Sequence, residues 1–215
     1  MNMNENIVGV ITGDIVASQK IHAEDYDCML YTLERTLTML KASRNMKFET
    51  YRGDAFQSVF AEPVEAIHSA VIIRLALKAT TPSFDVRQSI GIGAVTSMRG
   101  DIATSTGEAF TLSGKGLDTI KNDLIKVSSN NLAFQSKVSV LTKFLDAHLS
   151  SLTGIQSETL LCYLTSEDKS HADIAESLNK TRSNTTKLLI ASRYQLVEEY
   201  LNYVKLCVSE EFKHV

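Results

Sequence analysis

Two aspartates, Asp14 and Asp54, each lie at the end of a predicted strand. Asp14 follows the apolar run 7–11 and Thr12-Gly13, and Asp54 follows Gly53 between two β-prone runs. Gly and Asp are common in tight hairpin turns, which need positive φ, so turn formation alone would explain Gly53-Asp54. If the fold brings the two carboxylates together, they form an oxygen-rich site of the kind that hard divalent cations prefer.

The order of the predicted elements favours such a meeting. Continuous β-branched residues predict a buried first strand, and apolar residues at spacings of three and four predict helices. The elements expected are a strand at 7–11, a helix at about 23–43, hairpin arms at 48–51 and 55–60, a helix from Pro63 to about 79, and a strand at 84–95. This β-α-β-β-α-β order, with antiparallel and parallel pairing in one sheet, places the first strand beside the hairpin.

The pattern changes to helices in the last third of the chain. A polar loop at 96–107, a helix at about 108–120 and an edge strand at 124–127 complete the sheet region. The helices expected after it are at 132–152, 156–164, 170–178 and 182–208. The sequence therefore predicts an α+β chain. It comprises a ferredoxin-like or palm sheet domain at 1–130, a connecting helix at 131–154 and an all-helical helix-turn-helix region at 155–215.

Composition and charge narrow the class of protein. The 215 residues are 44% hydrophobic and 22% charged, which is typical of a globular chain. The net charge of -3 argues against a positive electrostatic field over the whole protein that would attract nucleic acid. Basic patches must therefore be sought locally. The scattered cysteines and histidines show no paired metal-ligand spacing. Without a signal peptide or a membrane-spanning run, we expect cytoplasmic localisation and no membrane partner.

Four spaced segments, in one order, resemble the SatD family of bacterial proteins. They are Ile11 to Ser18, Arg52 to Gln57, Arg87 to Gly93 and Gly107 to Phe110. The resemblance spans about residues 7–120. The family is described as transcriptional regulators without an established reaction, so the resemblance implies regulation rather than a particular chemistry.

The same segments resemble the palm domain of class III nucleotidyl cyclases, in which two strand-end carboxylates bind metal ions. Asp14-Ile15 matches the first carboxylate motif and Gly53-Asp54 the second. The resemblance implies Mg²⁺ or Mn²⁺ at Asp14 and Asp54, because such ions are held by carboxylates together with phosphate oxygens. It also implies a nucleotide, whose phosphates would meet Arg52 and the backbone N–H groups of Ile15, Val16, Ala17 and Ser18.

Other positions depart from the cyclase pattern. Thr111 stands where those enzymes carry an Asn, and Lys115, the candidate catalytic and phosphate-binding residue, stands where they carry an Arg. One extra residue at Tyr51-Arg52 displaces Glu49 from the base-selecting position. Arg87 is interpreted as a strand residue on a solvated face, with pairing to a carboxylate or phosphate as the alternative. The resemblance supports catalysis of cyclisation less well than nucleotide binding, because a palm domain that binds a nucleotide without turning it over explains the same residues.

The segment Ser170 to Leu189 resembles a helix-turn-helix. Ile174 and Leu188 would face inward, and Asn179 would take the left-handed turn conformation. No acidic residue lies between Ser177 and Val197, which favours double-stranded DNA over packing alone. The DNA-binding candidates are Lys180, Arg182, Ser183, Asn184, Thr186, Lys187 and Arg193.

The preferred hypothesis is a cytoplasmic transcriptional regulator in which a nucleotide with a metal ion biases the DNA-binding helices. The apolar series Tyr194, Val197, Leu201 and Val204 favours a homodimer, which would match a two-fold operator. Two alternatives remain: an active nucleotidyl cyclase or nucleotidyltransferase, and a non-catalytic oligomerisation protein.

Overall fold

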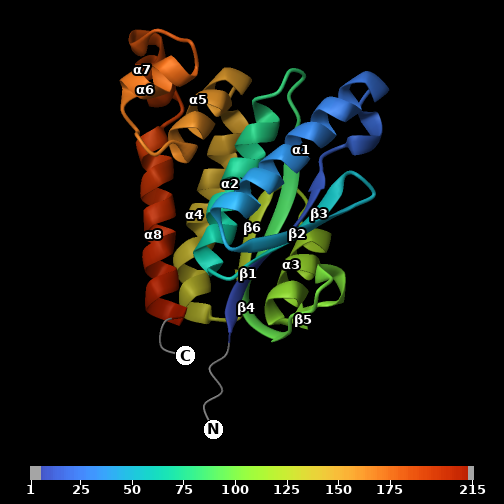
Figure 1. Ribbon diagram of the computed structural model, residues 1–215. Helices are drawn as coiled ribbons and strands as arrows, with labels where there is room; N and C mark the ends of the chain where they lie inside the picture. Colours follow the sequence, from blue (N-terminus) through green and yellow to red (C-terminus); the bar gives the residue numbers. More distant parts are fainter. Residues whose placement is uncertain (1–5, 213–215) are drawn as a thin grey trace.

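The computed structural model describes residues 6–212, which form one sheet with helices on both faces (Figure 1). The strands are β1 (Ile7–Ile15), β2 (Met46–Tyr51), β3 (Ala55–Phe60), β4 (Val86–Ser97), β5 (Thr106–Gly107) and β6 (Ile125–Ser129). The helices are α1 (Ala23–Ser43), α2 (Pro63–Lys78), α3 (Glu108–Thr119), α4 (Leu132–Ser151), α5 (Gly154–Thr165), α6 (His171–Ser177), α7 (Arg182–Ala191) and α8 (Tyr194–Phe212). Two 3-10 helices, η1 (Ser18–Lys20) and η2 (Ile102–Thr104), lie after β1 and before β5.

The sheet has the strand order β2-β3-β1-β4-β5, and β6 pairs with β4 outside this path. The pairs β2–β3, β3–β1 and β1–β4 are antiparallel, whereas β4 and β6 run parallel. The predicted β-α-β-β-α-β order and the position of the first strand beside the hairpin are therefore confirmed. The chain is α+β, with a mainly antiparallel sheet and its helices in the N-terminal part, followed by an all-helical region.

The two faces of the sheet are covered differently. On one face, Ile11 and Ile15 of β1 belong to a large core shared with α1 and α2, whose apolar stripes supply residues such as Leu33. On the other face, Val8 and Val10 pack with Ala109 of α3 in a smaller cluster. Because side chains alternate along a strand, the even-numbered residues of β1 face α3 and the odd-numbered residues 11 and 15 face α1 and α2.

A glycine brings α3 directly onto the sheet. A Cβ atom at Gly91 of β4 would lie 2.1 Å from the carbonyl oxygen of Ala109, so no larger residue fits without moving the helix. Glycine at this position therefore permits the close approach of the α3 backbone to β4.

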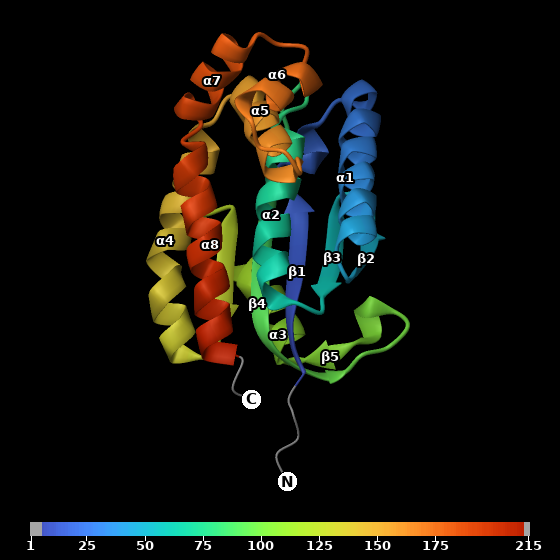
Figure 2. The same cartoon turned by 60° about the vertical axis from the view of Figure 1, so that its left-hand side comes forward.

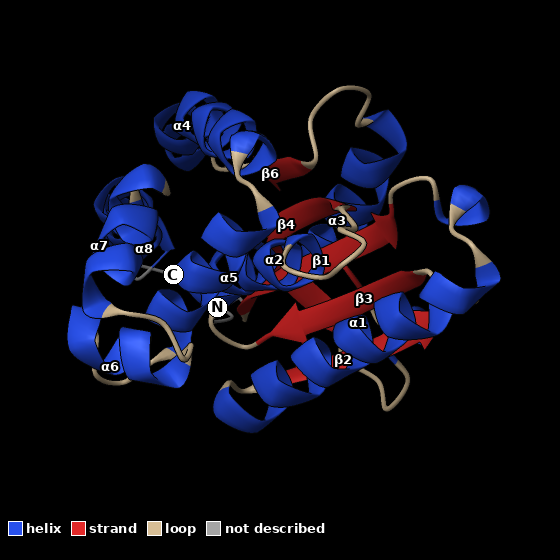
Figure 3. Ribbon diagram, turned by 90° about the horizontal axis from the view of Figure 1, so that it is seen from above, coloured by secondary structure: helices blue, strands red, loops and turns tan. Residues whose placement is uncertain are grey.

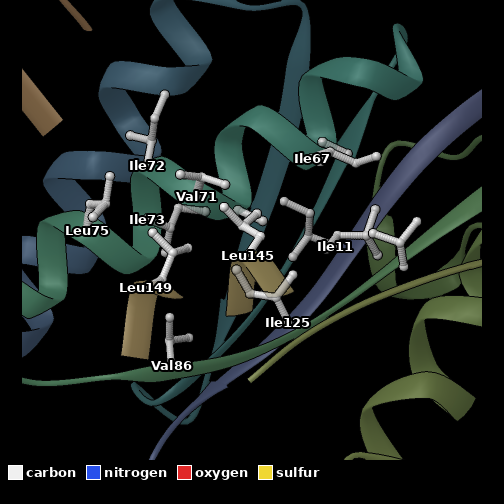
Figure 4. Close-up of a cluster of buried hydrophobic side chains, with 14 of the residues drawn as sticks. Ile11, Ile67, Val71, Ile72, Ile73, Leu75, Val86, Ile125, Leu145 and Leu149 are labelled. Carbon is white, nitrogen blue, oxygen red and sulfur yellow. The ribbon is translucent and has the colours of Figure 1, made fainter. Parts of the chain in front are cut away.

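The C-terminal helices pack against the sheet domain without a flexible tether. Figure 2 shows α4 and α8 side by side along one flank, and Figure 3 shows the same helices beside the sheet from above. Leu145 and Leu149 of α4 belong to the same core cluster as Val71 of α2 and Ile125 of β6 (Figure 4). The segment expected as a connecting helix therefore contributes to the core. Within residues 6–212, no helix is long and apolar enough to cross a bilayer.

The helix expected at 182–208 is wrong, because the structure has two helices there. Arg193 adopts φ +51 between α7 and α8, a left-handed conformation that ends the first helix. The residues expected on a dimer-forming face are also misassigned. Val197, Leu201 and Val204 are buried in the core of the single chain, so they are not available to a partner.

A buried ion-pair network joins the sheet domain to the helical part. Arg74 of α2 is fully buried and donates to both carboxylate oxygens of Asp85, at 2.8 and 3.1 Å, and to Asp146 of α4. Asp146 also accepts hydrogen bonds from the backbone N–H groups of Leu124 (3.1 Å) and Ile125 (3.0 Å). Burial raises the pKa of Asp146, whereas the charge of Arg74 opposes this. The network fixes α2, α4 and the start of β6 relative to one another.

Candidate functional site

Polar side chains gather on the face of the sheet opposite α1 and α2, the face on which α3 packs. Thr12 and Asp14 of β1 lie on this face, because they alternate with the core residues Ile11 and Ile15. Gln57 on β3 donates to the Thr12 hydroxyl (3.1 Å), which donates in turn to Ser113 of α3 (3.0 Å). A hydrogen-bonded polar row therefore runs from the hairpin to α3 across the first strand.

Asp14 forms an ion pair with Arg87 in this row. The two residues are direct partners in the β1–β4 register. The Nε atom of Arg87 donates to Oδ1 of Asp14 at 3.0 Å, and a terminal nitrogen donates to Oδ2. The hydrogen bond and the charge of Asp14 raise the pKa of Arg87. The preference for an unpaired, solvated Arg87 was therefore wrong, and the alternative of a carboxylate partner is correct.

Asp54 lies at the tip of the predicted hairpin. Tyr51 and Ala55 are paired, so Arg52, Gly53 and Asp54 form a three-residue loop. Arg52 and Gly53 have φ of +53 and +82, so the positive φ expected at Gly53-Asp54 occurs at Gly53 and at the residue before it. The Asp54 carboxylate accepts a hydrogen bond from the Ser18 hydroxyl (2.6 Å).

The backbone brings the two aspartates to neighbouring positions. Asp14 pairs with Ala55 in the β1–β3 register, and the Ile15 N–H donates to the carbonyl of Asp54 at 2.8 Å. The two carboxylates nevertheless have different partners, Arg87 for Asp14 and Ser18 for Asp54. Within residues 6–212, no cluster of three or more His, Cys, Asp or Glu side chains is arranged to hold a metal ion.

The carboxylates of Asp14 and Asp54 can bind a divalent cation only after the side chains around them rearrange. A cation bound to Asp14 would lie beside the guanidinium of Arg87, and the two positive charges would repel each other. Arg87 must therefore leave Asp14 before a metal ion binds there. Phosphate is a ligand that draws a guanidinium strongly, because it accepts paired hydrogen bonds from it.

The expected phosphate-binding segment is only partly free. The N–H groups of Ile15 and Val16 donate to the carbonyls of Asp54 and Asp85, at 2.8 and 2.9 Å. Ala17 adopts φ +52 and is followed by η1, whose Ser18 hydroxyl binds Asp54. The N–H groups of Ala17 and Ser18 therefore remain as the candidates in this segment.

Sequence reasoning missed the role of Glu49. Its carboxylate accepts hydrogen bonds from the backbone N–H groups of Ile102 (2.8 Å) and Ala103 (3.2 Å) in η2 and from the Tyr51 hydroxyl (2.9 Å). These bonds, the one from Ile102 above all, lower the pKa of Glu49. Glu49 thus anchors the loop between β4 and β5. Nothing in the sequence indicates that a carboxylate on β2 contacts a Gly-containing loop about fifty residues later.

A second candidate surface lies at the opposite end of the chain, on α6 and α7. The two helices are joined by residues 178–181, and Asn179 has φ +50, as predicted for the turn. Ile174 of α6 and Leu189 of α7 form a small core with Tyr163 of α5, and Thr185 is also buried. Leu189 rather than Leu188 is the fully buried residue at this position.

The predicted DNA-binding residues fall into two groups. Arg182, Ser183, Asn184, Lys187 and Arg193 are exposed. Two others have partners, because Lys180 donates to Glu158 of α5 (2.7 Å) and the Thr186 hydroxyl lies 3.0 Å from Nδ1 of His171. The outward surface of α7 therefore carries polar and basic side chains without an acidic residue.

Comparisons with known proteins find structural similarity to nucleotidyl cyclase domains and identify no family. No family model matches the chain, and no curated protein matches it. Among solved structures, the monomeric guanylyl cyclase domain of the RhoGC fusion protein from the aquatic fungus Blastocladiella emersonii is 20% identical, over 58% of this chain and 81% of that chain, with a TM-score of 0.48. The guanylate cyclase domain of RhGC from Catenaria anguillulae, in complex with GTP, is 20% identical over 58% of this chain and 79% of that chain (TM-score 0.47). The adenylyl cyclase CyaB from P. aeruginosa is 15% identical over 57% and 76% (TM-score 0.43).

Thr111 and Lys115 are exposed on α3, whereas Ser113 and Gly116 of the same helix are buried toward the sheet. The Thr111 hydroxyl donates to the Gly107 carbonyl of its own helix (3.1 Å). The two positions at which the sequence departs from the cyclase pattern are therefore on the solvent side of this helix.

Proposed function

We propose that this protein is a transcriptional regulator that binds double-stranded DNA through α7. The observation that carries the proposal is the composition of the outward face of α7. Arg182, Ser183, Asn184 and Lys187 are exposed there, at and just after the start of the helix. In helix-turn-helix proteins, these are the positions of the second helix that meet base edges and phosphates in the major groove.

The packing of α7 supports this proposal, because it leaves the basic face free. Thr185 and Leu189 are buried toward α5 and α6, so the helix is held by one side only. The Thr181 hydroxyl caps its first turn by accepting from the Asn184 N–H (3.3 Å). A capped helix on a small core is a rigid platform for the exposed side chains.

The partners of Lys180 and Thr186 divide the candidate residues by role. Lys180 is neutralised by Glu158, and Thr186 binds His171, so both are assigned to holding the helices together. Arg182, Lys187 and Arg193 supply the positive charge for phosphate contacts. Ser183 and Asn184 supply donors and acceptors for base edges.

For the sheet domain, we propose that it senses a nucleotide bound with Mg²⁺ or Mn²⁺. A phosphate group at Arg87 would draw the guanidinium away from Asp14 and free that carboxylate for the metal ion. Asp54, Arg52 and the N–H groups of Ala17 and Ser18 line the same strand ends. In this arrangement the nucleotide and the metal ion bind together, and neither binds well alone.

Fluorescence anisotropy with a labelled DNA duplex tests the proposed DNA binding. At low salt, the wild-type chain should bind, and affinity should fall steeply as salt rises. Arg182→Ala with Lys187→Ala should lose most of the binding. Lys47→Ala with Lys121→Ala removes the same charge from exposed positions of the sheet domain and should bind normally. Equal affinity of the two double variants would refute the role of α7.

Thermal denaturation with ligands tests the sensor. A nucleoside triphosphate with Mg²⁺ should raise the melting temperature of the wild-type protein, whereas Mg²⁺ alone should have little effect. Identical responses of wild type and Asp54→Ala would refute the assigned site. Pyrophosphate release in the same mixtures would instead support the enzyme alternative, an active cyclase or nucleotidyltransferase.

A further inference from the structure

The outer edge of β6 is covered by side chains of α4 instead of a further strand. Within residues 6–212, β6 pairs with β4 alone, and Figure 3 shows it at the side of the sheet with α4 next to it. The Gln88 N–H of β4 donates to the Leu124 carbonyl (2.7 Å), so the even-numbered residues at 124–128 bond to β4. The N–H and C=O groups of Ile125, Val127 and Ser129 therefore point to the outer edge.

Two side chains of α4 bind the two ends of this edge. Asp146 accepts from the Ile125 N–H (3.0 Å) at one end. At the other end, the amide of Gln135 accepts from the Ser129 N–H (2.8 Å) and donates to the Val127 carbonyl (3.1 Å). Between them, within residues 6–212, the Ile125 carbonyl and the Val127 N–H form no hydrogen bond. The edge therefore has a gap one residue long, with one acceptor and one donor.

A cavity of about 460 Å³ opens on this gap. Ile125 and Val127 line it from β6, and Ser139 lines it from α4, one helical turn after Gln135. The volume lies within the range of small-molecule sites in proteins. Backbone donors and acceptors are strong hydrogen-bonding groups that are almost always paired, so this gap calls for a polar ligand or water.

The length of the gap decides between a peptide and a small molecule. A peptide strand added at this edge would collide with Asp146 at one end and Gln135 at the other. A single residue presents one N–H and one carbonyl oxygen to the same side, and these match the Ile125 carbonyl and the Val127 N–H. A free amino acid carries the same pair, an α-ammonium donor and an α-carboxylate acceptor.

The charges around the cavity favour an amino acid with an acidic side chain. Lysine side chains line it, among them Lys126 and Lys143, and within residues 6–212 neither of these two forms a salt bridge. Lys126 donates to the Thr119 hydroxyl (2.9 Å), which holds its ammonium group at the cavity without neutralising it. Asp123 also lines the cavity and is suited to an α-ammonium group. These charges complement the two carboxylates and the ammonium group of aspartate or glutamate.

We propose that this cavity, named here the β6-edge site, binds an α-amino acid with an acidic side chain. The α-carboxylate accepts from the Val127 N–H and the Ser139 hydroxyl, and the α-ammonium donates to the Ile125 carbonyl. The side-chain carboxylate pairs with Lys126 and Lys143. The β6-edge site shares no residue with the ion pair at Asp14 or with α7, so it does not rest on the function proposed above.

NMR titration of the full chain with L-glutamate tests the backbone contacts. The Val127 amide resonance should shift more than those of Ile125 and Ser129, whose N–H groups already have partners. Glutarate, which has the two carboxylates and no amino group, should bind more weakly. No shift of Val127 at millimolar glutamate would overturn the proposal. Equal binding of glutarate would overturn the assigned amino-acid contact, because anion binding by lysines alone would explain it.

Calorimetric titration of variants with L-glutamate tests the side chains. Lys143→Met should weaken binding roughly tenfold, because it removes a hydrogen bond between charged groups. Ser139→Leu should abolish binding by filling the cavity, with unchanged circular dichroism. Lys47→Met removes the same charge from an exposed position of β2 and should bind normally. Equal affinity of Lys143→Met and Lys47→Met, or full binding by Ser139→Leu, would refute the β6-edge site.

Discussion

Asp14 and Arg87 face each other directly across β1 and β4, and the guanidinium of Arg87 donates to both carboxylate oxygens of Asp14. The pair is partly exposed, with 27% of the Asp14 side chain and 40% of the Arg87 side chain accessible. Because both side chains are partly exposed, a ligand can reach the pair. A ligand that takes Arg87 away would leave an uncompensated carboxylate, and we therefore propose that the pair couples anion binding to cation binding.

Arg87→Gln should allow a metal ion to bind at Asp14, because the substitution removes the guanidinium that repels the ion. Without the guanidinium, Asp14 carries an uncompensated charge beside Asp54, and Mn²⁺ alone should raise the melting temperature of the variant more than that of the wild type. Differential scanning fluorimetry over a series of Mn²⁺ concentrations measures the difference. Adding Asp14→Asn to Arg87→Gln is the control and should remove the effect. An equal Mn²⁺ response in wild type and Arg87→Gln would contradict the assigned coupling.

Removal of Arg74 should cost far more stability than removal of Arg87. Arg74→Met leaves Asp146 without a cation and Asp85 with only Lys78, at 3.7 Å, and breaking a buried pair in this way costs about 3–5 kcal/mol. Arg87→Gln breaks a partly exposed pair and should cost about 1 kcal/mol or less, since solvent screens it. Urea denaturation of the two variants gives both free energies. A similar loss in both would show that the Arg74 network does not stabilise the fold.

His68 should make the protein less stable in mild acid. Burial lowers the pKa of His68 from 6.5 to about 4, with further contributions from the charges of Arg44, Lys205 and Lys169. As the pH falls below 6.5, the unfolded chain takes up a proton that the folded chain refuses until about pH 4. This group alone should therefore remove about 2 kcal/mol of stability by about pH 5.

His68→Gln checks this pH dependence. The free energy of unfolding is measured by urea denaturation at about pH 7 and about pH 5 for wild type and variant. The variant has no imidazole to protonate, so its loss between the two pH values should be smaller by the contribution of His68. The same loss in both proteins would mean that His68 does not titrate differently in the folded and unfolded states.

Substitution of Asn179 by Gly should preserve the turn before α7, whereas substitution by Ala should destabilise it. Its φ of +50 is accessible to Gly without strain, whereas Ala in this conformation costs about 1–2 kcal/mol. Asn179→Ala should speed amide hydrogen exchange in α7 and weaken DNA binding, and Asn179→Gly should preserve both. Hydrogen-exchange mass spectrometry distinguishes the two. Equal protection of α7 in both variants would contradict the role of this turn.

Local chemistry in the sequence predicted much of the fold. Alternation and apolar spacing gave the order of strands and helices as far as residue 178, except for the two-residue strand β5 inside the expected loop at 96–107. The Gly53 and Asn179 turns follow from residues that tolerate positive φ. The break at Arg193 was missed because Arg has no preference for that conformation. After this residue, α8 adds Val197 and Leu201 to the core that α4 also joins.

The contacts that define the sites were harder to predict, because they depend on register. Asp14 meets Arg87, and Glu49 meets Ile102, across sequence separations of 73 and 53 residues. The burial of Val197, Leu201 and Val204 was likewise invisible, since an apolar stripe looks the same whether it packs within the chain or against a second copy. On α8, the exposed residues, such as Leu196, lie on the side of the helix that faces away from the core.

Selection from a random pool of DNA duplexes tests the central claim most directly, because the pool contains candidate operators of every sequence. The wild-type protein should enrich a common base sequence. The selected duplex should bind the Lys47→Ala with Lys121→Ala control as it binds the wild type, and Arg182→Ala with Lys187→Ala should lose it. No enriched sequence, or full binding by the Arg182→Ala with Lys187→Ala protein, would contradict DNA recognition by α7.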